Sequence, residues 1–218
     1  MPPRRRWNSS GAPFWAVRRK LRPPPSVRLF LSFEPPDDVR DALAVFQQRL
    51  RSRIPDVRWV RPELLHATMT FLGEVDPAVL AALLPEIRTI SAGHRVCGVT
   101  YEGVGVFPNA RRPNVLWVGV TRMDQTLHRL KTELDAAVLR HGVALEERSF
   151  RPHVTLGRFR VGGRVDDLTP TLETLTFEPQ RTSVQGIQVM RSDLSARGPA
   201  YTVLATNPLQ QRTSHQDQ

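Results

Sequence analysis

The chain has 218 residues, of which 40% are hydrophobic, 24% charged and 7% aromatic. This composition is typical of a globular protein of one domain or two small ones, and it excludes a fibrous or wholly disordered chain. The single cysteine, Cys97, excludes an intramolecular disulfide and favours a reducing cytoplasm. The longest apolar stretch, residues 78–84, is far shorter than the ~20 residues of a membrane span, so no membrane partner is expected.

The net charge of +10 is concentrated at the N-terminus. Residues 1–26 contain seven basic and no acidic residues, which leaves a charge of only +3 for the remaining residues. The segment is rich in Pro, Arg and Ser and shows no periodicity, so we expect a disordered basic leader. A nucleic-acid-binding arm is the alternative interpretation. The overall charge therefore does not identify a partner for the rest of the chain.

Regular periodicity begins at Val27 and gives the same order of elements twice. Alternating residues predict strands, and apolar residues three and four apart predict helices. The expected elements are strands over 27–33, 57–60 and 65–72, helices that begin at 37 and 77, strands over 99–107 and 115–120, a helix between 124 and 142, and strands over 151–159, 183–190 and 201–205. Asp76 and Asp124 are typical N-cap residues, and Gly142 is typical of a helix end.

The two halves also agree in spacing. Val27 lies 39 residues before His66, Val115 lies 38 residues before His153, and an Arg-Pro pair precedes each histidine. This internal duplication predicts an α+β protein with two lobes related by a pseudo-two-fold axis. We expect a single two-lobed domain over residues 27–207, with lobes of roughly 27–95 and 96–207, and a polar tail over 208–218.

Each half carries a histidine followed two positions later by a threonine: His66 with Thr68, and His153 with Thr155. Because side chains alternate along a strand, the members of each pair point the same way, and the two-fold axis would bring both pairs into one cleft. Imidazole titrates near pH ~6.5, so one ring can accept a proton while the other donates one. Threonine hydroxyls and Arg158 can bind phosphate oxygens. The pattern favours phosphodiester chemistry.

Alternation also assigns the neighbours of the first histidine. Thr70 is expected beside His66 in the cleft, and Met69 and Phe71 are expected in the core. For either motif alone, ordinary packing is the alternative, whereas two copies at matching positions favour a site. A metal site is the other alternative, but no Asp, Glu or Cys stands at ligand spacing, so no metal is expected.

Other rings carry weaker signals. Phe107 and Tyr201 are candidates for stacking a terminal base, and Trp117 is expected in the core because it lies in an apolar strand. The remaining histidines have no motif around them and are expected to be exposed: His94, His128, His141 and His215.

Two stretches resemble known signatures: RPELLHATMTFLG at 61–73 and RPHVTLGR at 151–158. They look like the two motifs of the bacterial and archaeal RNA 2′,3′-cyclic phosphodiesterases. These enzymes belong to the two-histidine phosphoesterase superfamily and were first called 2′-5′ RNA ligases. The likeness covers residues 27–206 and excludes the leader.

The resemblance implies antiparallel sheets that line a central cleft, with helices outside. It implies that a terminal 2′,3′-cyclic phosphate is opened to a 2′-phosphate without a metal or nucleotide cofactor. Carried over, His66 and His153 are the acid–base pair, Thr68 and Thr155 bind the phosphate, and Arg158 matches the arginine after the second motif. The family leans toward His66 as the acid and His153 as the base, and the residues of this sequence leave that assignment open. The expected partners are RNA ends or small cyclic-phosphate nucleotides, and the protein is expected to be a monomer.

Two other functions stay open on the sequence. A non-catalytic module could bind phosphorylated RNA or nucleotide ends, although binding alone would not need two acid–base groups. An RNA-end ligase that forms 2′-5′ bonds would be ATP-independent, because the chain shows no Gly-rich phosphate loop or nucleotidyl-transfer lysine motif. The sequence does not specify which RNA or nucleotide is the cellular substrate.

Overall fold

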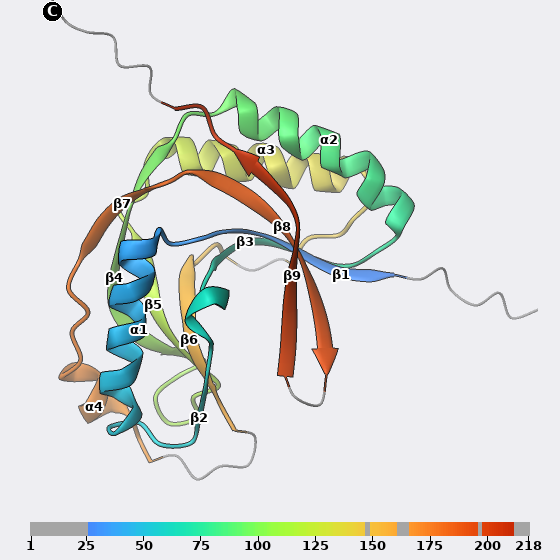
Figure 1. Cartoon of the computed structure of the whole chain (residues 1–218). Coiled ribbons are helices and arrows are strands. Elements are labelled where there is room, and N and C mark those ends of the chain that lie inside the picture. The colour runs from blue at the N-terminus through green and yellow to red at the C-terminus, as the bar shows by residue number, and fades with distance from the viewer. Residues whose placement is uncertain (1–25, 147–148, 161–165, 196–197, 212–218) are drawn as a thin grey trace, which may run out of the picture.

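The computed structural model describes residues 26–146, 149–160, 166–195 and 198–211 (Figure 1). The elements in chain order are β1 (Val27–Phe33), α1 (Asp37–Arg51), β2 (Val57–Trp59), the 3-10 helix η2 (Pro62–Leu64), β3 (Ala67–Val75), α2 (Pro77–Gly93), β4 (Cys97–Phe107), β5 (Val115–Thr121), α3 (Gln125–Arg140), β6 (His153–Phe159), α4 (Thr169–Glu173), β7 (Gln180–Val184), β8 (Gly186–Ser195) and β9 (Gly198–Pro208). Sequence periodicity did not predict η2 or α4, which are only three and five residues long.

The predicted helix boundaries are confirmed. Asp76 and Asp124 are the N-caps of α2 and α3, and their carboxylates accept hydrogen bonds from the backbone N–H of Ala78 and Thr126 at 2.7 and 2.8 Å. Gly142, just beyond the end of α3, has a φ of +76°, a left-handed conformation that favours glycine.

The strands of the described chain form one sheet in the order β7-β4-β5-β6-β3-β1-β8-β9, and β2 also pairs with β6. Neighbouring strands run antiparallel, which confirms the α+β prediction. The two motif strands meet at the centre of the sheet, where Ala67 of β3 lies opposite Val154 of β6. Because β8 and β9 lie beside β1, the expected lobe boundary near residue 95 is not a boundary of the sheet.

The single strand predicted over 183–190 is wrong. The structure has two strands there, β7 and β8, separated at Gln185. β7 pairs with β4, whereas β8 pairs with β1 and β9 at the other side of the sheet. In Figure 1 this segment runs across the molecule. Val184 and Ile187 are buried on either side of the crossing, so the sequence pattern could not show the change of partner.

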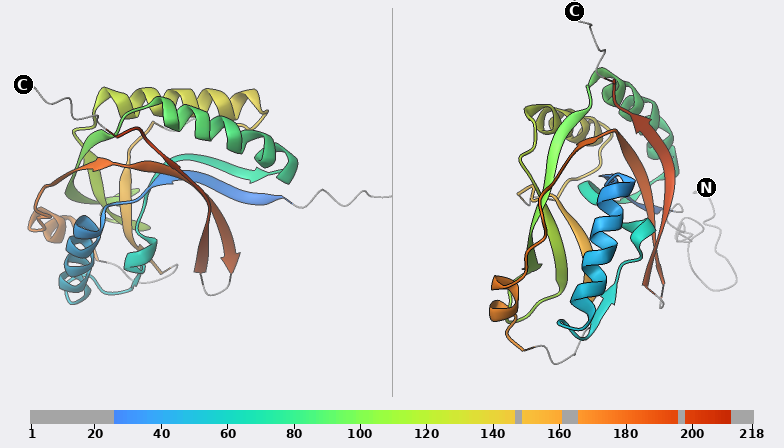
Figure 2. Two further views of the ribbon diagram at one scale, coloured as in Figure 1. Left: turned by 45° about the horizontal axis from the view of Figure 1, so that its top comes forward. Right: turned by 60° about the vertical axis from the view of Figure 1, so that its left-hand side comes forward.

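Each long helix that precedes a motif strand packs against the other motif strand. In α1, which follows β1, Gln47 donates a hydrogen bond to the carbonyl of Leu156 in β6. α3, which follows β5, packs against β3, where Thr70 donates to Asp135. α2 and α3 lie side by side, and α1 lies apart from them (Figures 1 and 2). The helix of each half thus contacts the motif strand of the other half, and these contacts stabilise the two halves against each other.

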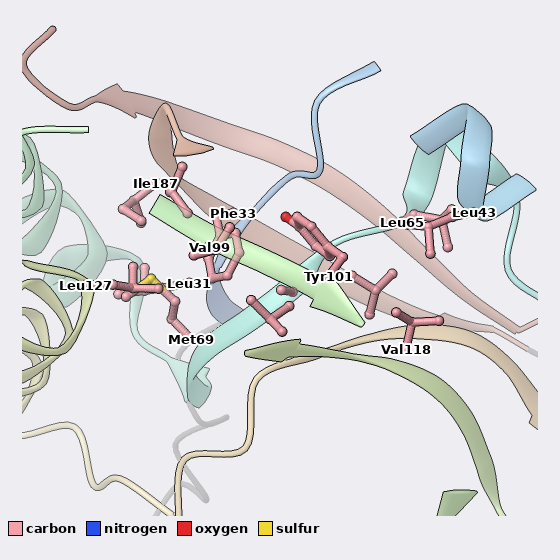
Figure 3. Close-up of a cluster of buried hydrophobic side chains, with 14 of the residues drawn as sticks. Leu31, Phe33, Leu43, Leu65, Met69, Val99, Tyr101, Val118, Leu127 and Ile187 are labelled. Atoms are coloured by element: carbon pink, nitrogen blue, oxygen red, sulfur yellow. The ribbon is translucent and has the colours of Figure 1, made fainter. Parts of the chain in front are cut away.

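The core lies between the sheet and these helices. Figure 3 shows Leu31 and Phe33 of β1 packed with Met69 of β3 and with Val99 and Tyr101 of β4. All five are at most 4% exposed. Burial raises the pKa of the Tyr101 hydroxyl above its ordinary value. Leu31 and Phe33 belong to this core, whereas Phe30, which precedes Leu31 in β1, stacks on a motif histidine instead.

The C-terminal segment is more ordered than predicted. Leu209 is 3% exposed, and the backbone of Gln210 hydrogen-bonds with His94 and Val96. Residues 208–210 are therefore part of the folded protein and not of the predicted polar tail. Residues 1–25 of the predicted leader and residues 212–218 lie outside the described residues. None of the helices described here is long and apolar enough to cross a membrane.

Two histidines expected to be exposed are half-buried and paired. His94 lies 3.1 Å from the carboxylate of Glu133, and His141 lies 2.8 Å from that of Glu86. One contact joins the residue just after α2 to α3, and the other joins α2 to the C-cap of α3. His128 is exposed, as predicted, and His215 lies outside the described residues.

Candidate functional site

The two motif histidines have the same local geometry. His66 lies immediately before β3, and His153 is the first residue of β6. In each ring Nδ1 lies 2.7 Å from the carbonyl oxygen two residues earlier, that of Leu64 or Arg151. A carbonyl can only accept, so Nδ1 carries a hydrogen and Nε2 of the neutral ring keeps its lone pair. Either ring is therefore arranged to accept or donate a proton at Nε2.

A β-bulge in β6 turns Arg158 toward the histidines. Leu116 of β5 lies opposite Gly157 and Trp117 lies opposite Thr155, so Leu156 is the extra residue. Without this irregularity, strict alternation would place Arg158 on the face opposite Thr155. Both residues instead line the same cleft.

A matching irregularity in β3 makes two predictions from strict alternation wrong. Thr68 lies opposite Ser32 and Thr70 lies opposite Leu31, so Met69 is the extra residue. Beyond it Phe71, expected in the core, is 47% exposed and lines the cleft. Thr70, expected beside His66, is 6% exposed and donates a hydrogen bond to Asp135 of α3 at 2.6 Å.

The two bulges place Phe71 and Arg158 at equivalent positions. Each follows its motif histidine by five residues, and each faces the cleft. The two halves of the site therefore carry the same imidazole and hydroxyl groups. They differ at the fifth residue after each histidine, which is the apolar ring of Phe71 in one half and the cation of Arg158 in the other.

The structure brings both histidines and both threonines together in one cleft of about 570 Å³. Arg158 and Tyr201, two further sequence candidates, also line it. The other lining residues are Arg28, Leu29, Phe30, Arg58, Trp59, Val60, Arg61, Leu64, Phe71 and Ser192. Sequence reasoning missed the roles of Phe30, Arg58 and Trp59, because β1 and β2 carry no motif and only pairing with β3 and β6 brings them to the cleft.

Aromatic rings hold each imidazole. Phe30 stacks on His66 with ring centroids 5.0 Å apart, and Tyr201 meets His66 edge-on at 5.1 Å. Phe107 meets His153 edge-on at 5.0 Å. Base stacking by Phe107 or Tyr201 stays a prediction. Trp117, expected in the core, is only half-buried and lies 6.2 Å from His153.

This setting lowers the pKa of both imidazoles below the ordinary value of 6.5. Burial is the largest cause, because an apolar surrounding disfavours the charged ring. The hydrogen bonds to Leu64 and Arg151 act in the opposite direction. The charge of Arg158 lowers the pKa of both histidines, and His153 also lowers that of His66. The charge of Glu34 raises the pKa of His66.

We expect His66 and His153 to titrate below pH 6.5 when their ring resonances are followed by NMR. Arg158→Gln should raise both pKa values, because it removes a nearby positive charge that disfavours the imidazolium forms. Arg88→Gln, which changes an exposed arginine of α2 that does not line the cleft, is the matched control. Titration midpoints above 6.5 in the unsubstituted protein would contradict this electrostatic account. So would midpoints in the Arg158→Gln variant that equal those of the unsubstituted protein.

A second hollow of about 880 Å³ adjoins the first beyond His153. The two share five lining residues: Thr68, Phe71, His153, Thr155 and Arg158. Phe107 and Phe150 line the second hollow, and Lys131 and Asp135 of α3 pair at its wall at 2.5 Å. This side of the site is aromatic and of mixed charge.

Among the described residues, no group of three or more His, Cys, Asp or Glu side chains is placed to hold a metal ion. The two histidines contact aromatic rings and backbone carbonyls instead. The arrangement offers two nitrogen acid–base groups, two hydroxyls and a guanidinium around one space, which suits proton transfer at a bound anion.

The chain matches known proteins in sequence and in fold. The family model described as LigT-like phosphoesterase matches the chain twice, over residues 33–117 and 118–201. An RNA 2′,3′-cyclic phosphodiesterase of Methanothermobacter thermautotrophicus is 32% identical over 81% of this chain and 95% of its own length. A crystal structure of a Thermus thermophilus protein has a TM-score of 0.69 at 27% identity, and covers 85% of this chain and 100% of that chain. E. coli LigT complexed with 3′-AMP has a TM-score of 0.67 at 24% identity, with 86% and 100% covered, and shares the fold.

Proposed function

Because the chain belongs to the family of LigT-like phosphoesterases, we propose that it hydrolyses a terminal 2′,3′-cyclic phosphate of RNA to a 2′-phosphate. The observation that carries the proposal is the pair of His-x-Thr motifs facing one cleft, with both Nδ1 atoms engaged and both Nε2 atoms available. The match to relatives named RNA 2′,3′-cyclic phosphodiesterase supports the same activity.

In the proposed reaction a water molecule attacks phosphorus in line with the bond to O3′. Nε2 of neutral His153 accepts the proton of the attacking water as the new P–O bond forms. Nε2 of protonated His66 donates a proton to O3′ as the P–O3′ bond breaks, so the phosphate remains on O2′. After turnover His66 is neutral and His153 is charged, and proton exchange with solvent restores the starting forms.

The other site residues bind the phosphate in this proposal. Thr68 and Thr155 donate hydrogen bonds to the non-bridging oxygens and hold phosphorus in line with the water. Arg158 offsets the negative charge that develops on those oxygens. Burial lowers the pKa of both rings, which favours the neutral form that His153 needs as a base and reduces the fraction of free enzyme in which His66 is protonated as the acid requires.

The comparisons give neither the oligomeric state of this protein nor its location in the cell. We propose that the protein acts as a monomer on RNA ends or small cyclic-phosphate nucleotides in the cytoplasm. Its only cysteine, Cys97, is buried, and burial raises the pKa of that thiol to about 11, which suits a structural and unreactive side chain. ATP-independent 2′-5′ joining stays a prediction from the sequence.

The test is incubation with an oligoribonucleotide that ends in a 2′,3′-cyclic phosphate, followed by phosphorus NMR of the product. We expect a terminal 2′-phosphate, formed at the same rate in EDTA, because acid–base catalysis by two imidazoles needs no metal. The same oligonucleotide ending in a 3′-phosphate should remain unchanged. Binding without turnover would favour the non-catalytic module. A 3′-phosphate product would contradict the proposed proton donation to O3′, and rescue from EDTA by Zn²⁺ or Mn²⁺ would contradict the two-histidine mechanism.

A further inference from the structure

Arg58 lies directly opposite Arg158 where β2 pairs with β6. Their neighbours in this register, Val57 and Phe159, are 9% and 8% exposed, so alternation turns both arginines to the other face, where both line the cleft. Cβ atoms of directly opposed residues in antiparallel strands lie ~4.5–5.5 Å apart. The two guanidinium groups therefore serve neighbouring parts of the same cleft.

Within the described part of the chain this pair of positive charges is not neutralised. Both side chains are exposed, and neither has an ion pair with a described carboxylate. Arg28 and Arg61 line the same cleft, and its lining contains no Asp or Glu. Like charges directly opposite each other destabilise a strand pair, and bound anions would relieve that repulsion. The arrangement is suited to more than one negative charge.

The two sides of the site differ in charge. The first cleft is lined by four arginines and no acid, although Arg61 also pairs with Glu63, whereas the second hollow is lined by Asp135 and Glu146 together with Lys131, Arg151 and Arg158. A chain of phosphodiesters that ends at the histidines is therefore more favoured on the side of Arg58, where the excess of positive charge is larger, than on the side of α3.

Resting on the proposed function, we propose that Arg58 binds the phosphodiester that precedes the terminal cyclic phosphate. Arg158 serves the reacting phosphate, and Arg58, one strand farther from the histidines, serves the next phosphate along the RNA. A cyclic mononucleotide has no second phosphate and cannot make this contact. Arg58 thus makes the enzyme prefer an oligonucleotide end over a cyclic mononucleotide.

The experiment compares kcat/KM for a diribonucleotide ending in a 2′,3′-cyclic phosphate with that for 2′,3′-cyclic AMP. Arg58→Ala should lower kcat/KM about tenfold on the dinucleotide, mainly through KM, as expected for one exposed charge-assisted contact. The kcat/KM of this variant on 2′,3′-cyclic AMP should not change. The dependence of log(kcat/KM) on log salt should become shallower on the dinucleotide only, because one ionic contact with a phosphate is lost. Arg58→Lys should retain the salt slope, and Arg88→Ala is the matched control.

Each other outcome overturns the inference in a recognisable way. Equal losses on both substrates would place Arg58 at the reacting phosphate, and no loss on either would remove it from the site. If the unsubstituted protein turned over neither substrate, the proposed function itself would be contradicted.

Discussion

Replacing His66 or His153 with Ala should lower kcat/KM on a cyclic-phosphate end about 10²–10⁴-fold, the usual range for loss of a general acid or base. Each ring holds its Nδ1 against a backbone carbonyl and keeps Nε2 for proton exchange, so an alanine removes the imidazole of that half of the site. Steady-state kinetics on an oligoribonucleotide with a 2′,3′-cyclic phosphate measures the loss. Near-normal rates in either variant would refute the mechanism.

The double variant separates a cooperating pair from two independent contributions. If the imidazoles act together, the loss in the double variant should be far smaller than the product of the two single losses. His128→Ala is the matched control, because His128 is an exposed histidine of α3 that does not line the cleft. Unchanged thermal unfolding of all variants would show that the losses arise at the site and not from unfolding.

Gln47→Leu should lower the free energy of unfolding by about 2 kcal/mol, the scale of a buried carbonyl that loses its partner. Gln47 is 2% exposed, and its amide nitrogen donates hydrogen bonds of 2.8 Å to the carbonyls of both Val60 and Leu156. Leucine fills a similar volume but donates nothing, and a buried carbonyl left short of its partner costs ~1–3 kcal/mol. Urea unfolding followed by circular dichroism measures the change.

Gln48→Leu is the control, because Gln48 is the next residue of the same helix and is exposed. A surface substitution of this kind usually changes stability by less than about 0.5 kcal/mol. Equal stability of the Gln47 and Gln48 variants would show that the two hydrogen bonds from α1, to Val60 just after β2 and to Leu156 of β6, contribute nothing net. A selective loss at Gln47 would establish that α1, from the first half of the chain, stabilises the strand that carries His153.

The duplicated motif and its elements could be predicted from the sequence because their causes are local. Apolar spacing defines the helix faces, Asp76 and Asp124 satisfy free N–H groups at helix starts, and both caps are confirmed. Residues two apart on a strand share a face, which is why each histidine was placed with its threonine. These relations involve neighbours along the chain, so periodicity and residue type suffice to find them.

Other features depend on pairing between distant segments. Strict alternation would have turned Phe71 to the core and Arg158 away from the threonines. The extra residues Met69 and Leu156 arise only when β3 pairs with β1 and β6 pairs with β5. Periodicity could not reveal them, because a bulge depends on the register of the partner strand.

The sequence by itself determined the α+β class, the internal duplication and the two His-x-Thr pairs, since all of these are patterns within short segments. Only the tertiary structure decided what surrounds them. It stacked Phe30 on His66 and set Arg58 opposite Arg158. It also placed β8 and β9 beside β1. Such contacts join residues far apart along the chain, and they exist only once the strands have chosen their partners and the buried faces have packed.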